Sequence, residues 1–116
     1  MDTMDRLELA SKKREEGYNC CQCVILACAD LADLPEEANY AGFCFGAGMN
    51  CGSVCGALTG GLMAIGASLP RRDVLQNRPL AREAALELEK RICGECVAFA
   101  AEQTEDIISK IKKGEL

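Results

Sequence analysis

Small residues recur at every fourth position through the middle of the chain, and this spacing restricts how the chain can fold. The positions are Gly48, Gly52, Gly56, Gly60 and Ala64. Residues four apart lie on one face of an α-helix, so the pattern predicts a helix with a flat stripe along one side. Gly inside a helix costs about 1 kcal/mol relative to Ala, so a packing reason is expected. We predict that another helix backbone packs closely on this stripe, with a cofactor on the stripe as the alternative.

Composition favours helices over a sheet. Of the 116 residues 49% are hydrophobic, but only 4% are aromatic and Trp is absent, so the core must be built from Ala, Leu, Ile, Val and Cys. No segment shows the sustained alternation of a strand. The sequence predicts an all-α bundle of about five helices in a single cysteine-rich domain, 1–116, with a Gly-rich loop before the fourth helix. The helices are expected at residues 2–16, 20–32, from 35 onward, at 52–70 and at 79–113.

Charge and hydropathy limit the possible partners. The net charge is −5, which argues against nucleic acid, because that affinity depends on Lys and Arg neutralising phosphates. Residues 41–69 contain no charged side chain, but glycines interrupt them and their apolar part, 58–69, is too short for a membrane span. The N-terminus lacks the apolar region of a signal peptide, so a cytoplasmic location is expected. The glycine-faced helix makes a homodimer plausible.

Nine cysteines are the main compositional anomaly, and they suit either a secreted disulfide scaffold or an intracellular set of ligands. The odd count and the charged N-terminus favour reduced thiols. Six of them fall in close pairs on three predicted helices: Cys20 and Cys23, Cys51 and Cys55, Cys93 and Cys96. Cys51 and Cys55 are expected at a helix start, where the helix dipole favours thiolate.

Converging thiolates from such pairs would suit zinc, an iron–sulfur cluster or Cu(I). The chain has no His, so any site with nitrogen or sulfur ligands must be dominated by sulfur. Cys21, Cys28 and Cys44 have no such pairing, and we interpret them as small hydrophobic residues of the core.

Three segments resemble a known family. They are Gly-Tyr-Asn-Cys at 17–20, the glycine-rich residues 42–49, and Cys-Gly-Ala-Leu-Thr-Gly at 55–60, which matches a CGAxxG signature. In order and spacing they resemble the C_GCAxxG_C_C family, whose members are described as redox-active. The resemblance implies a small bacterial or archaeal protein with four characteristic cysteines that hold a redox or metal centre. Cys20 and Cys55 correspond to the first two, and the later two would fall near Cys93 and Cys96.

The leading hypothesis is a redox protein that binds a metal or iron–sulfur centre through Cys20, Cys55, Cys93 and Cys96 and relays electrons to an unidentified partner protein. Cys23 and Cys51 are reserve ligands. Storage or delivery of Cu(I) or zinc is one alternative, and thiol–disulfide exchange through Cys93 and Cys96 or Cys20 and Cys23 is another. The sequence argues against a conventional hydrolase, because it has no His and no nucleophile–base motif. Whether the protein is an enzyme stays open.

Overall fold

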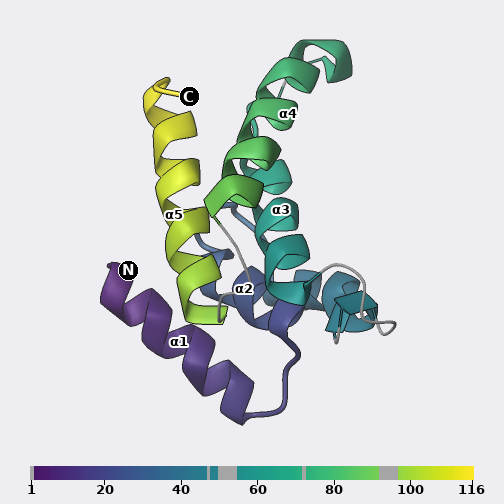
Figure 1. Cartoon of the computed structure of the whole chain (residues 1–116), viewed down its shortest axis with the longest axis vertical. Helices are drawn as coiled ribbons and strands as arrows, with labels where there is room; N and C mark the ends of the chain where they lie inside the picture. Colours follow the sequence, from purple (N-terminus) through teal and green to yellow (C-terminus); the bar gives the residue numbers. More distant parts are fainter. Residues whose placement is uncertain (1, 47, 50–54, 72, 92–96) are drawn as a thin grey trace.

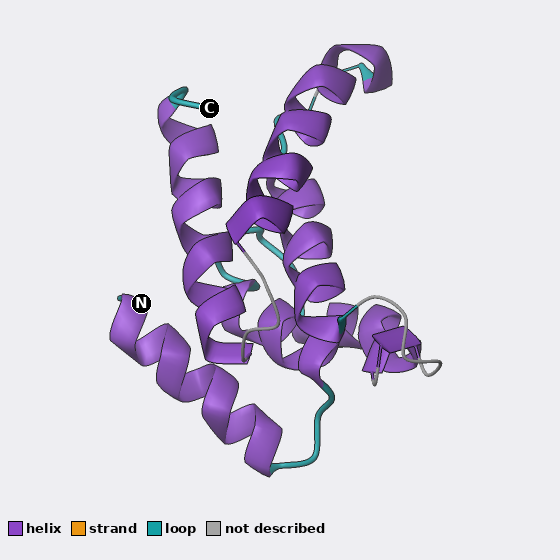
Figure 2. Ribbon diagram, viewed as in Figure 1, coloured by secondary structure: helices purple, strands orange, loops and turns teal. Residues whose placement is uncertain are grey.

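A computed structural model describes residues 2–46, 48–49, 55–71, 73–91 and 97–116. Within these residues the chain forms helices and no strand, which confirms the all-α prediction (Figure 2). The described helices number six rather than about five, and one of them is a 3₁₀-helix, η1. They are α1 (Thr3–Glu15), α2 (Cys20–Cys28), η1 (Glu36–Phe45), α3 (Gly56–Ser68), α4 (Val74–Arg91) and α5 (Val97–Lys113).

The helix predicted over 79–113 is wrong, because two helices occupy this part of the chain. α4 begins at Val74 and contains Pro79 in its interior, so Pro79 does not mark a helix start. A proline there removes one backbone hydrogen bond, but neighbouring bonds and packing can maintain the helix. Residues 92–96 lie between α4 and α5 and fall outside the described residues. α4 and α5 run in opposite directions (Figure 1).

Helix α2 lies at the centre of the bundle. It packs against α1, η1, α3 and α5 (Figure 1). Every residue from Cys21 to Cys28 is therefore buried, whichever side of the helix it occupies. Cys20, which begins the helix, and Leu31, beyond its end, are half-buried, so full coverage is confined to Cys21–Cys28.

The glycine stripe of α3 lies directly on α2. A Cβ atom placed on Gly60 would come within 2.5 Å of the carbonyl oxygen of Cys21 and 3.1 Å of its Cα. One turn earlier, a Cβ on Gly56 would lie 3.1 Å from the backbone nitrogen of Cys21. The predicted close contact between two helix backbones is confirmed, and it sets the spacing between α2 and α3.

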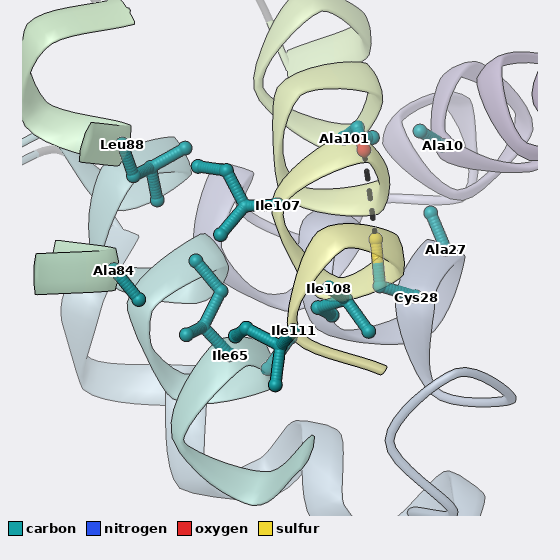
Figure 3. Packing of buried hydrophobic residues seen from close by; sticks show 11 residues of the cluster. Ala10, Ala27, Cys28, Ile65, Ala84, Leu88, Ala101, Ile107, Ile108 and Ile111 are labelled. Carbon is teal, nitrogen blue, oxygen red and sulfur yellow. Dashed lines mark hydrogen bonds between the residues drawn. The ribbon is translucent and has the colours of Figure 1, made fainter. Parts of the chain in front are cut away.

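The main hydrophobic core lies between α3, α4 and α5 and extends to α1 and α2 (Figure 3). Branched aliphatic side chains fill its centre: Ile65, Leu88, Ile107, Ile108 and Ile111. Cys28 belongs to this core, and its thiol lies 3.7 Å from the carbonyl oxygen of Ala101. Its interpretation as a core residue agrees with this position.

A buried arginine connects α1 to the rest of the bundle. The side chain of Arg6 is only 2% exposed and forms ion pairs with Asp30 and Glu105, the latter at 2.6 Å. It also donates a hydrogen bond of 2.8 Å to the carbonyl oxygen of Ala27, near the end of α2. One guanidinium group thus joins three parts of the chain that are far apart in sequence.

None of the helices in the described part of the chain has the length and apolar character needed to cross a bilayer. α3, which lies within the uncharged segment, packs its Gly56 and Gly60 against α2.

Candidate functional site

Helix α2 begins with a capping box that places Cys20 in its first turn. The side-chain oxygen of Asn19 accepts a hydrogen bond from the backbone nitrogen of Gln22 at 2.9 Å, and the side-chain oxygen of Gln22 accepts one from the backbone nitrogen of Asn19 at 3.1 Å. Such reciprocal bonds satisfy backbone donors that a helix start leaves unpaired. Cys20 follows the cap directly and is half-buried.

The same Asn19 joins α2 to η1. Its side-chain nitrogen donates hydrogen bonds to the carbonyl oxygens of Phe43, at 2.9 Å, and Gly42, at 3.2 Å. A Cβ placed on Gly46, just after η1, would lie 2.8 Å from the Cβ of Asn19. The end of η1 is therefore held against the start of α2.

The 3₁₀ geometry of η1 decides which of its side chains reach solvent. Such a helix has three residues per turn, so residues three apart lie in line. Asn39 and Gly42 form the buried row, and Gly42 packs against the thiol of Cys21. Cys44 lies off this row and is exposed, so its interpretation as a core residue is wrong.

Helix α3 begins at the same place. Cys55 is its N-cap residue, so it lies at a helix start as predicted, and its side chain is exposed. A Cβ placed on the next residue, Gly56, would lie 2.8 Å from the carbonyl oxygen of Phe45 and 3.4 Å from the Cβ of Cys20. The start of α2, the end of η1 and the start of α3 therefore meet. We call this region, with Cys20, Cys44 and Cys55, the thiol end of the bundle (Figure 1).

Two helix N-termini lie close together at the thiol end. The partial positive charges of two helix N-termini, those of α2 and α3, converge there, and the first turn of a helix leaves backbone N–H groups available to an anion. A thiolate is the reactive form of cysteine and the form that binds metals. Cys20 and Cys55 can therefore act as nucleophiles, redox groups or soft ligands.

The buried cysteines of α2 differ chemically from those at the thiol end. Burial raises the pKa of Cys21, raises that of Cys23 to about 11 and raises that of Cys28 to about 12. These thiols are protonated at neutral pH. Cys21 lies 3.9 Å from the sulfur of Met63, and Cys23 lies 3.6 Å from the carbonyl oxygen of Tyr18.

The structure brings together only part of the predicted ligand set. Cys20 and Cys55 lie in the same region, whereas Cys51, Cys93 and Cys96 fall outside the described residues. Cys23 is fully buried one turn into α2. Among the residues that the structure describes, no group of three or more Cys, Asp or Glu side chains has the arrangement of a metal site. The thiols of Cys20 and Cys55 have the donor chemistry for a soft metal and would supply two of its ligands.

Two features of this region were not predicted from the sequence. One is the exposure of Cys44, and the other is the exposed aromatic pair Tyr40 and Phe43 on η1. Both depend on the three-residue repeat of a 3₁₀-helix, whereas the sequence was interpreted with the α-helical repeat. The run of Tyr40, Phe43 and Phe45 in a chain that is poor in aromatics is the signal that could have drawn attention to it.

Fold and site together define an all-helical, cysteine-rich bundle with thiols at two adjacent helix starts. The chain belongs to the C_GCAxxG_C_C family, whose model carries the description "Putative redox-active protein" and matches residues 18–91. The match includes Cys20 and Cys55 and ends before Cys93, so the assignment of Cys93 and Cys96 to the later family cysteines stays a prediction. No curated protein and no solved structure matched the chain.

Proposed function

We propose that the chain is a redox protein whose working sulfur atoms are those of Cys20 and Cys55. The observation that carries this proposal is the contact of Cys20 with the start of α3, where its Cβ lies beside Gly56, the residue after Cys55. Both residues begin helices, and both are within the segment that matches the family model. The description of the family supports redox activity in general, and the two adjacent helix starts place both cysteines at one end of the bundle.

We further propose that the two thiolates hold a metal or iron–sulfur centre and relay electrons through it, with Cys93 and Cys96 as the other ligands. Such a centre would supply one-electron chemistry, and the chain would supply sulfur ligands and a helix-dipole field that stabilises their charge. Of the two reserve ligands, Cys23 suits this role poorly. Its burial raises the thiol pKa to about 11, so metal binding would have to displace a proton from a closed site.

Thiol–disulfide exchange is the second candidate function, and the contact between the two helix starts favours Cys20 and Cys55 as its pair. Oxidation of the two thiols to a disulfide would release two electrons and two protons to an oxidising partner, such as another disulfide. This pair differs from those expected from sequence spacing, because Cys23 is buried behind Cys20 in α2.

Anaerobic purification followed by elemental analysis and a visible absorption spectrum tests the proposal. The expected result is bound metal or a cluster that is lost in both Cys20→Ser and Cys55→Ser. Cys44→Ser is the matched control, because it removes an exposed thiol from the same end of the bundle. A metal-free protein that forms a reversible Cys20–Cys55 disulfide, identified by peptide mass spectrometry, would establish the second candidate. If the protein binds no metal and these two thiols neither pair nor affect a redox titration, the proposal is wrong.

A further inference from the structure

A row of exposed side chains runs along η1 beside the thiol end. Glu37, Tyr40 and Phe43 are three residues apart, so the 3₁₀ repeat places them in line. Tyr40 is 66% exposed and Phe43 is 60% exposed. Their rings lie stacked, with centroids 6.1 Å apart and planes 2° from parallel. Two exposed aromatic rings held in a fixed stack form a rigid surface for contact with another molecule.

The row borders a hollow on the surface of the protein. An open pocket of about 280 Å³ lies between η1 and the turn before α2, and its wall includes Glu16, Tyr18, Asn19, Tyr40 and Phe43. A smaller pocket of about 130 Å³ shares Tyr18 and Tyr40 with it and adds two carboxylates, those of Glu36 and Glu37. We refer to the two pockets together as the aromatic–acidic hollow.

The chemistry of the aromatic–acidic hollow suits a cation. Its lining combines aromatic rings, whose faces attract positive charge, with three carboxylates and no basic side chain. The chain itself places a cation at the edge of this region. The ammonium nitrogen of Lys13 lies 5.4 Å from the centre of the Tyr18 ring and 3.5 Å from a carboxylate oxygen of Glu16. An arginine would fit better still, because its planar guanidinium can stack on a ring and pair with a carboxylate at once.

The hollow and the thiol end share the first turn of α2. Asn19 and Gln22 line it, and Cys20 lies between them in the sequence at the start of α2. Asn19 also bonds to the carbonyl oxygen of Phe43, so the aromatic row and the first turn of α2 are held together. A molecule seated in the hollow would therefore approach the thiol end.

We propose that the aromatic–acidic hollow docks a basic side chain, Arg or Lys, on the surface of the protein that exchanges electrons with this chain. This inference rests on the proposed redox function. The net charge of −5 would attract a positively charged partner over distance, and the hollow would fix its orientation beside Cys20. The stacked rings would orient the basic side chain of the partner, and the carboxylates would select its positive charge.

The experiment uses a short peptide, acetyl-Gly-Arg-Gly-Arg-Gly-amide, titrated into the ¹⁵N-labelled, fully reduced protein at low salt. Amide shifts of Tyr18, Gln22, Tyr40 and Phe43 are expected to move together and to saturate. Physiological salt should weaken the binding, because the charges are exposed. Tyr40→Leu and Glu37→Gln should each weaken it by about two- to five-fold, the range of a single cation–π or exposed charge contact.

The controls separate docking from general acidity. Glu89→Gln removes an exposed carboxylate on α4, away from the hollow, and should leave the binding within about 1.5-fold of the original. An acidic peptide, acetyl-Gly-Glu-Gly-Glu-Gly-amide, should cause no shifts in the hollow. Equal effects of Glu37→Gln and Glu89→Gln, or shifts scattered over the surface, would overturn the docking proposal.

The titration is repeated with the double variant Cys20→Ser, Cys55→Ser to distinguish the two proposals. Binding of the basic peptide should persist, because neither sulfur lines the hollow. If the redox tests fail while peptide binding holds, the hollow is a docking site for a basic protein of another function and the electron-exchange part of the inference is wrong. If peptide binding fails while the redox tests succeed, the docking part is wrong.

Discussion

Gly60→Ala should destabilise the protein by forcing α2 and α3 apart. The added Cβ would lie 2.5 Å from the carbonyl oxygen of Cys21, whereas ordinary contact begins near 3.4 Å, so the helices would have to separate by about 0.9 Å. Overpacking of this kind costs about 1 to 3 kcal/mol, and a backbone obstacle places it at the upper end. The helix preference of Ala over Gly returns about 1 kcal/mol. The expected net loss is about 2 kcal/mol, which lowers the melting temperature by about 8 °C for a chain of this size.

Gly66→Ala is the matched control for this prediction. It lies in the same helix, but no atom outside the local backbone comes within 4 Å of its added Cβ, and the residue is exposed. The helix preference of Ala should therefore raise its stability by about 0.4 to 1 kcal/mol. Urea unfolding of the reduced proteins, followed by circular dichroism at 222 nm, measures both changes. If Gly60→Ala is as stable as the unmodified protein, the close contact between α2 and α3 is not what requires glycine.

Four further predictions concern charge and thiols. Arg6→Met should lower the free energy of unfolding by about 2 to 3 kcal/mol in urea, less than the usual loss for a broken buried pair because Asp30 is 45% exposed; an unchanged midpoint would contradict this. Burial raises the pKa of Asp30, but the other interactions, led by the hydrogen bond from Arg6, together outweigh burial and lower that pKa overall. The free energy of unfolding should therefore fall as the pH drops below about 4, and Arg6→Met should lose less stability over this range. The free energy of unfolding should also fall as the pH rises above about 8.5, because Cys28 loses its proton in the unfolded chain but keeps it in the folded one, where burial raises its pKa to about 12. Cys28→Ala should make this fall less steep, and the same slope in both proteins would refute the role of Cys28. In brief iodoacetamide treatment at pH 8, mass spectrometry should find Cys44 labelled well before Cys23, whose pKa is raised to about 11 by burial, and comparable rates would contradict that burial.

Local signals in the sequence predicted the parts of the fold that depend on local chemistry. The first helix was expected at 2–16 and is found at Thr3–Glu15, and the second was expected from residue 20 and begins at Cys20. The four-residue glycine repeat predicted the contact that joins α3 to α2. These features follow from turn residues and from helical spacing, which a short window of sequence contains.

Features that depend on the surroundings of a helix could not be predicted in this way. Residues 20–32 were predicted as a helix, but helical periodicity carries no information about the burial of Cys21 or Cys23, because other elements enclose α2 from Cys21 to Cys28. The exposure of Cys44 depends on η1 having three residues per turn rather than 3.6. At the site, the sequence indicated Cys20 and Cys55 through the resemblance to a family, but the neighbouring hollow exists only after η1 has docked on α2.

The side chain of Asn19 links the two activities proposed for this end of the molecule. Its oxygen holds the first turn of α2, and its nitrogen holds the carbonyl groups beneath the aromatic row. A movement of that turn when the sulfur of Cys20 changes its oxidation state would be transmitted to the surface where a partner binds. Such coupling is reciprocal. A partner that bound the reduced protein tenfold more tightly than the oxidised protein would raise the midpoint potential of a two-electron couple by about 30 mV. Binding of the partner would thus make the sulfur harder to oxidise.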